Sequence, residues 1–129
     1  MKAQSHRAKA ERLGRSLAKC RPGDYEMIID GAMLAVTHWI NVALHTVALT
    51  DDDSDVVHAY FETAFDRQHL GLVVGTEFLD GLEEIETLRP LHARGNVAGG
   101  EAAAVRALDI LQGIREKALA FVSDSPATD

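Results

Sequence analysis

The chain has a single cysteine, Cys20, so no disulfide can form within it and no Cys-x-x-Cys metal site can be built. Aromatic residues make up only 5% of its 129 residues, and there are three prolines. This scarcity favours helices over strands, because aromatic residues are typical of strands and proline interrupts helices. The one unpaired cysteine suits a reducing compartment, and we therefore expect a cytoplasmic protein.

The residues that are abundant predict an all-α single domain. Hydrophobic residues make up 47% of the chain and charged residues 26%, a balance typical of globular proteins. Apolar residues at helical spacing predict helices at about residues 4–20, 25–49, 55–69, 77–89 and 100–122. Inward-facing residues are expected to include Val57, Phe61 and Phe65 in the third helix and Val105 in the fifth. Residues 71–75 are compatible with a connector or with continued helix.

The second predicted helix is apolar around most of its circumference, which is typical of a helix enclosed by others. We therefore expect an up-down bundle of about five helices around this central apolar helix. It would form one domain at residues 1–122, followed by a frayed tail at 123–129. Residues 31–49 carry no formal charge and are nearly long enough to cross a bilayer. Their polar residues, His38 and Asn41 among them, favour a core helix over a membrane span.

Charge is distributed unevenly along the chain. Seven of the 13 lysines and arginines lie in the first 21 residues, where Glu11 is the one acidic residue, while residues 22–129 hold 6 basic and 19 acidic residues. The favoured interpretation is that the basic first helix lies against acidic faces of its own bundle or of a twin subunit. Binding of nucleic acid is the alternative, but the acidic remainder of the chain would repel phosphate.

His38, Asn41 and His45 share one face of the second predicted helix, because they are spaced by three and four residues. They are candidate ligand-binding residues, although core polar groups with hydrogen-bond partners would give the same pattern. A metal site using His38 and His45 would need His58 and Glu62, at i and i+4 on the third predicted helix, as further ligands. No Glu-x-x-His or His-Glu-x-x-His motif is present, so the sequence assigns no metal and no cofactor.

Two arginines and a histidine, Arg89, His92 and Arg94, fall where the fourth predicted helix gives way to a loop. Guanidinium groups match phosphate oxygens in pairs, so Arg89 and Arg94 are candidate ligand-binding residues. The alternative is that these arginines tie the acidic fourth helix to a neighbour. No nucleophile motif and no phosphate-binding glycine loop accompanies them.

Three stretches of the chain resemble small HEPN-domain proteins of prokaryotes. They are residues 35–44 of the second predicted helix, residues 55–61 after the acidic loop, and Leu88-Arg89 followed by Arg94-Gly95 before an Ala- and Glu-rich last helix. The resemblance spans about residues 24–120. It implies a helical bundle that forms dimers and often accompanies nucleotidyltransferases.

The ribonuclease motif of that family is not intact in this chain. Ribonuclease members pair an arginine with a histidine, with four to six residues between them, whereas Arg89 is followed at those positions by Arg94, Gly95 and Asn96. His92 comes too early. The resemblance therefore implies a non-cleaving association module.

We expect such a module to be a homodimer that binds a nucleotide or a partner protein of the toxin–antitoxin or nucleotidyltransferase type. A ribonuclease using Arg89, His92 and Arg94 is one alternative, in which a general base acts beside two cations. The metal-binding bundle is the other.

Overall fold

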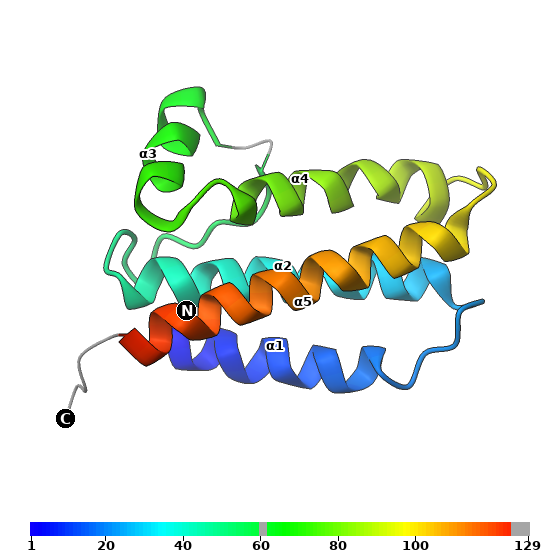
Figure 1. Cartoon of the computed structure of the whole chain (residues 1–129), viewed down its shortest axis with the longest axis horizontal. Coiled ribbons are helices and arrows are strands. Elements are labelled where there is room, and N and C mark those ends of the chain that lie inside the picture. The colour runs from blue at the N-terminus through cyan, green and yellow to red at the C-terminus, as the bar shows by residue number, and fades with distance from the viewer. Residues whose placement is uncertain (60–61, 125–129) are drawn as a thin grey trace.

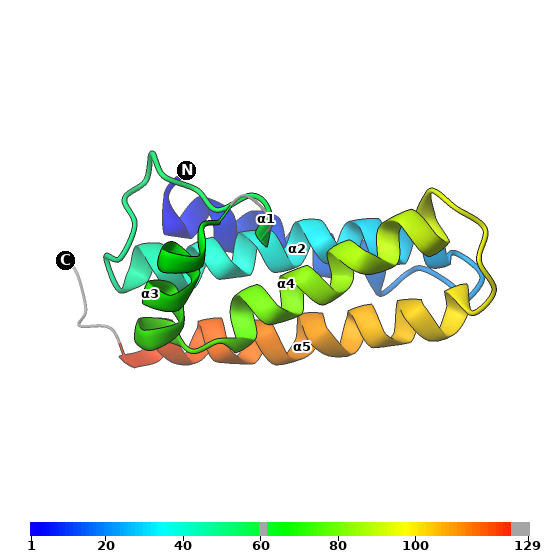
Figure 2. The same ribbon diagram turned by 90° about the horizontal axis from the view of Figure 1, so that it is seen from above.

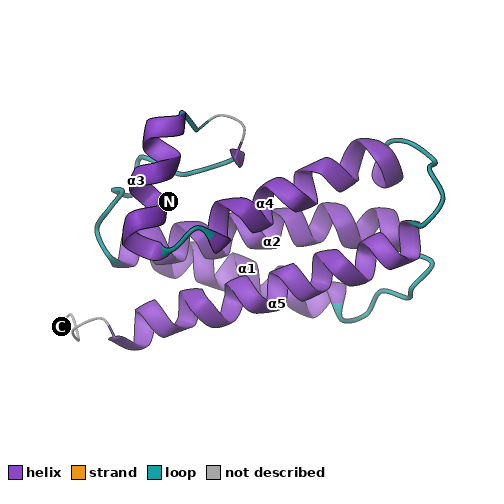
Figure 3. Ribbon diagram, turned by 45° about the horizontal axis from the view of Figure 1, so that its top comes forward, coloured by secondary structure: helices purple, strands orange, loops and turns teal. Residues whose placement is uncertain are grey.

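The computed structural model describes residues 1–59 and 62–124, and over these residues it contains helices and loops but no strand (Figure 3). The elements are α1 (Ala3–Leu17), α2 (Tyr25–Thr46), α3 (Ala64–Val74), α4 (Glu77–Leu88), the π-helical segment η2 (Arg89–Ala93) and α5 (Gly100–Asp124). The predicted all-α bundle is confirmed. Four helices, α1, α2, α4 and α5, alternate up and down along the bundle, and α3 lies across one end of it (Figure 1).

Helix α2 is the centre of the bundle, as predicted. It packs against α1, α4, α5 and η2, and twelve of its 22 residues are buried. Seen from above, it lies between α1 and α5 (Figure 2). Among the described residues it is the one helix long and apolar enough to cross a membrane, but 67% of that window is buried inside the protein, as in a core helix. It ends at Thr46, before the left-handed residue Ala48 (φ 58°).

The helices at either end of the chain differ from the prediction in small ways. Helix α1 ends at Leu17, three residues early, and α5 continues to Asp124, two residues beyond the predicted end of the domain. Val105 was predicted to face inward and is 58% exposed, because it lies on the outer side of α5. Residues 125–129 of the predicted tail lie outside the described residues.

The third helix begins later than predicted. It starts at Ala64, where the Thr63 hydroxyl accepts a hydrogen bond from the Asp66 amide at 3.0 Å, a standard N-cap contact. Val57, predicted to be internal, is 54% exposed in the loop before it, and Phe65 is 76% exposed. Phe61 lies outside the described residues. Residues 71–74 belong to α3, which ends at a glycine with positive φ, Gly75.

Helix α4 changes to a wider turn at Pro90. Proline has no amide hydrogen to continue the α-helical ladder, and the Arg94 amide instead bonds the Arg89 carbonyl at 2.8 Å. This segment, η2, leads to the loop before α5. After this segment the chain reverses direction, and α5 runs along α2. Residues 89–94 therefore lie at one end of the bundle.

Candidate metal centre

Two histidines and one aspartate converge at the end of the bundle where α1 begins. His6 comes from the first turns of α1, His45 from the last turn of α2, and Asp55 from the loop that follows α2. The Nε2 atoms of His6 and His45 lie 3.0 and 2.8 Å from the same atom, Asp55 Oδ1. One donor atom from each of the three residues lies within 4.8 Å of the other two.

The cluster is closed on the histidine side and open on the aspartate side. The side chains of His6 and His45 are each 2% exposed, whereas the side chain of Asp55 is 30% exposed. The amino group of Met1 lies 3.4 Å from both carboxylate oxygens of Asp55. The carboxylate is therefore the most accessible part of the cluster, and the Met1 amino group lies beside it.

The second nitrogen of each imidazole also has a partner. His6 Nδ1 lies 2.8 Å from His38 Nδ1, so one of these two nitrogens donates and the other accepts. His45 Nδ1 lies 2.7 Å from the Thr50 hydroxyl and 3.3 Å from the Thr50 carbonyl oxygen. Both rings are thus fixed at each end, which determines the direction in which their Nε2 atoms point.

The surroundings of His6 and His38 favour the neutral imidazole, and those of Asp55 favour the ionised carboxylate. Burial lowers the pKa of His6, and burial together with the nearby His6 lowers the pKa of His38 to about 4. Partial burial acts to raise the pKa of Asp55, but the hydrogen bonds from His6 and His45 outweigh it and lower that pKa to about 2. Neutral histidine and ionised aspartate are the forms that bind metal ions.

Asn41, predicted as a ligand-binding residue, instead holds the loop that carries Asp55. Its amide nitrogen donates to the carbonyl oxygens of Thr37 and Val56 at 2.9 and 2.7 Å, and its Oδ1 accepts from the Val56 amide at 2.8 Å. The side chain is completely buried. Because Val56 follows Asp55 directly, these bonds fix the backbone beside the carboxylate.

The metal ligands predicted on the third helix are not in the cluster. His58 and Glu62 both lie before α3, which begins at Ala64, and neither is part of an α-helix. His58 Nδ1 lies 3.2 Å from Glu86 Oε1, which also accepts from the Ala59 amide at 2.9 Å. The structure brings His45 together with His6 and Asp55, and His38 with His6.

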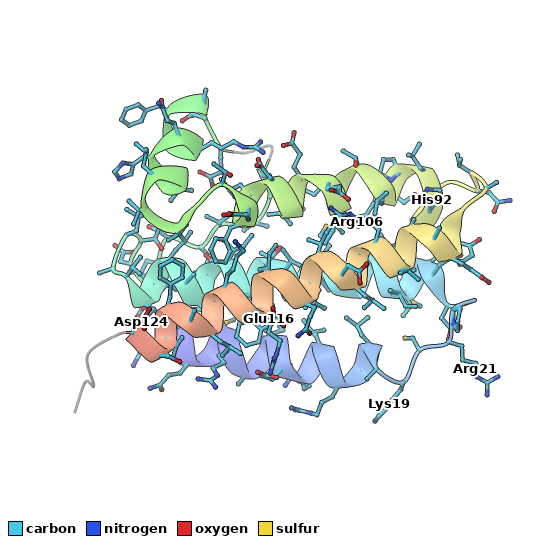
Figure 4. The ribbon with its side chains drawn as sticks, viewed as in Figure 1. Lys19, Arg21, His92, Arg106, Glu116 and Asp124 are labelled. Atoms are coloured by element: carbon cyan, nitrogen blue, oxygen red, sulfur yellow. The ribbon has the colours of Figure 1, made fainter. Side chains whose placement is uncertain are left out.

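Two of the three residues predicted for RNA cleavage, Arg89 and His92, have separate partners. Arg89 Nε donates to Asp30 Oδ1 at 2.7 Å and so ties the end of α4 to α2, while Arg94 is exposed. His92 is buried, and its Nδ1 lies 3.0 Å from the Val97 carbonyl oxygen. Figure 4 shows His92 at the end of the bundle opposite to the start of α1, so this segment is far from the histidine cluster.

Sequence reasoning missed His6 and Asp55. His6 lies four residues before Ala10, so helical spacing places it on the same side of the first helix as the apolar residues Ala10 and Leu17. Asp55 stands at the predicted start of the third helix, where an acidic residue is also typical of a helix N-terminus. Asp55 is only ten residues after His45, and a loop of that length is long enough to bring its carboxylate back to the end of α2.

Comparison with known proteins gives no relative from which a function can be transferred: no family model, no curated protein and no solved structure matches the chain.

Proposed function

We propose that this protein binds a divalent transition-metal ion through His6 Nε2, His45 Nε2 and the Asp55 carboxylate. The observation that carries the proposal is the convergence of these three donors, from three separate segments, within 4.8 Å. Two imidazole nitrogens and one carboxylate oxygen form a ligand set that binds zinc or ferrous iron, whereas calcium and magnesium prefer oxygen ligands alone.

The distances are close to those of a zinc site. Zinc–nitrogen and zinc–oxygen bonds of about 2.0–2.2 Å place tetrahedral ligand atoms roughly 3.4 Å apart. The two nitrogen–oxygen distances are 3.0 and 2.8 Å. Each imidazole nitrogen therefore needs to move away from the carboxylate oxygen by about half an ångström when the ion binds.

The partners of the second imidazole nitrogens support the same proposal. When Nε2 binds a metal ion, the ring proton resides on Nδ1 and needs an acceptor. Neutral His38 can accept it from His6, and Thr50 can accept it from His45 through its hydroxyl or carbonyl oxygen. Each histidine ligand thus has the kind of outer partner that orients metal-binding histidines in proteins.

Three protein ligands leave the fourth position of a tetrahedral ion for water or for an anionic ligand. This arrangement is typical of catalytic zinc sites, whereas structural sites have four protein ligands. The fourth position would lie on the open side, next to Asp55. The metal ion would supply Lewis acidity there, and the bundle would supply its rigid position.

Zinc titration of metal-free protein tests the proposal. Isothermal titration calorimetry is expected to show one zinc ion per chain, and Co²⁺ substitution is expected to give the visible absorption of a tetrahedral site. Asp55→Asn keeps an oxygen that accepts the histidine hydrogen bonds but loses the charge. It is expected to weaken zinc binding more than about 100-fold, the upper end of the loss caused by removing an outer partner.

His69→Gln is the matched control, because His69 is an exposed histidine on α3 away from the three donors. It is expected to bind zinc as the wild type does. Circular dichroism checks that each variant is folded. The proposal fails if folded wild-type protein binds less than about a tenth of an equivalent of zinc, cobalt or iron, or if Asp55→Asn binds them equally well.

A second proposal concerns association, as expected from the HEPN resemblance: we propose a non-cleaving homodimeric module that also binds a nucleotide or a partner protein. The observation that favours it is a groove of about 400 Å³ between α1 and α5, which Trp39 and two leucines of α5 line together with the charged residues Glu11, Arg15 and Arg115. Light scattering at micromolar concentration tests the dimer. A mass of one chain, 14.0 kDa, would contradict it.

A further inference from the structure

The cations at the start of the chain face solvent. Within the described part of the chain none of the seven lysines and arginines of residues 1–21 takes part in an ion pair, and all seven are exposed: Lys2, Arg7, Lys9, Arg12, Arg15, Lys19 and Arg21. The one acidic residue of this segment, Glu11, is turned toward α5, where it lies 3.3 Å from Arg115. The predicted packing of these cations against acidic faces of their own bundle is therefore not found among the described residues.

Four of these cations form a row along α1, which we call the basic strip: Lys9, Arg12, Arg15 and Lys19. The first three are spaced by three residues and so are neighbours on the helix surface, while Lys19 lies in the turn that follows α1. At the rise of an α-helix the row extends over roughly 15 Å. Figure 4 shows Lys19 and Arg21 pointing away from the bundle at the end of this helix.

The other residues of this face indicate which partner fits. Apart from Ala8, every exposed residue of α1 is polar or charged, and the first 24 residues of the chain include no Phe, Trp or Tyr. Protein interfaces have an apolar and aromatic core, membrane-bound helices insert an apolar face, and single-stranded nucleic acids stack on aromatic side chains. A face of cations without apolar residues instead matches the phosphates on the outside of a nucleic-acid duplex.

The helix with the most acidic residues, α4, is neutralised and lies away from the strip. Five of its 12 residues are acidic, and each of the five is paired within the chain, with Arg67, Arg106, Lys117 or His58. Helix α2 lies between α1 and α4 (Figures 1 and 2), and salt screens exposed charges beyond about 8 Å. The acidic loop 51–53 lies at the start of α1, before the strip, where the Met1 amino group donates to the Asp52 carbonyl oxygen.

We propose that the basic strip binds the phosphate backbone of duplex DNA without reading its base sequence. Each of the four cations contacts a phosphate, and binding releases the counterions condensed there. The strip is separate from the three donors of the metal site, so this proposal depends neither on metal binding nor on the dimer proposed above.

Fluorescence anisotropy with a labelled DNA duplex of mixed sequence tests the proposal. The wild type is expected to bind at low salt with a dissociation constant of about 100 μM or below. The slope of the logarithm of the binding constant against that of the salt concentration is expected to be about −3 to −4, because each neutralised phosphate contributes about −0.9. A slope near zero, or no binding at about 1 mM protein, overturns the proposal.

Two triple variants test the location. The strip variant, in which binding is expected to weaken at least about 10-fold and the slope to lose about 2–3 units, carries Arg12→Gln, Arg15→Gln and Lys19→Gln. The matched control, which lowers the net charge of −7 by the same three units and is expected to bind like the wild type, carries Arg94→Gln, Arg106→Gln and Lys117→Gln.

Circular dichroism checks that both variants are folded, and the salt slope of the wild type tests the proposal without any substitution. An equal loss of binding in the two variants shows that net charge acts rather than the strip, and overturns the location. Tighter binding to single-stranded DNA of the same sequence, or to vesicles of phosphatidylcholine and phosphatidylserine, identifies another polyanion and overturns the choice of partner.

Discussion

At the scale of single residues, Asn41 is the polar side chain on which the loop after α2 depends. All its hydrogen-bonding groups are used within a buried environment, and two of the three bonds go to the backbone of Val56. A loop has no ladder of its own to satisfy its backbone groups, so a side chain has to do so. Asn41 performs this role between the bundle core and the segment that carries Asp55.

Replacing Asn41 by alanine is expected to destabilise the protein by about 2–4 kcal/mol, because the amide and carbonyl of Val56 lose their partners in a buried place. Urea denaturation measures the change. Gln68→Ala, which removes an exposed amide from α3, is the control and is expected to stay within about 0.5 kcal/mol of wild type. A loss below about 1 kcal/mol for Asn41→Ala would show that water replaces the bonds.

At the scale of elements, α4 and α5 approach each other closely at Gly81. A Cβ atom there would lie 2.7 Å from Ile114 Cδ1 and 2.9 Å from Ile110 Cγ2. Both isoleucines are buried, so neither can move away freely. The absence of a side chain at position 81 therefore sets the spacing of these two helices.

Gly81→Val is expected to cost about 1–3 kcal/mol through overpacking, although valine has the higher helix propensity. Gly113→Val is the comparison, since its side chain enters open space and the propensity difference is the same. Thermal melting should place the first variant below wild type and the second at or slightly above it. Equal melting temperatures for the two variants would contradict this account of the helix spacing.

The elements also show how far the sequence predicts the fold. Helix α2 was predictable because residues that are apolar on all sides of a helix have to be enclosed, and its predicted start is confirmed. The start of α3 was not, because the acidic residues around Asp55 and the threonine at position 63 are both good caps. Asn41, fifteen residues before Val56, bonds both backbone groups of Val56, so these groups are not available to a helix that starts at Asp55.

The candidate site was predictable only in part. Helical spacing placed His38 and His45 on one face of α2, which the structure confirms. It contains no information about which distant segment meets that face. His6 lies 32 positions before His38 and Asp55 lies 49 positions after His6, so their meeting depends on how α1 docks and where the loop turns. Helical periodicity relates residues within one helix, whereas this cluster combines residues from α1, α2 and the loop after α2.

At the scale of the whole molecule, the cluster makes stability depend on pH. Folding lowers the pKa of His38 from 6.5 to about 4 and that of Asp55 from 3.8 to about 2. Between the two values of each pair the unfolded chain binds more protons than the folded protein does. Acidification therefore destabilises the protein, first between pH 6.5 and about 4 through His38, and then between pH 3.8 and about 2 through Asp55.

Melting temperatures of metal-free protein test this prediction. The wild type is expected to lose stability steadily as pH falls from about 6.5 to 4. His38→Phe removes the imidazole and is expected to reduce the fall in that range, where His6, whose pKa burial also lowers, still contributes, while keeping the fall at lower pH. A wild-type profile that is level between pH 7 and 4, or one that His38→Phe leaves unchanged, would contradict the assignment.

The 49 positions between His6 and Asp55 have a consequence for the cohesion of the fold. An ion held by both residues would join the beginning of the chain to its middle, as a covalent cross-link does, and would remove loop-closure entropy from the unfolded state. With one cysteine, the chain cannot form a disulfide within itself that would act as such a cross-link. The docking of the first helix would then follow the supply of metal, tightening where zinc is plentiful and loosening where it is scarce.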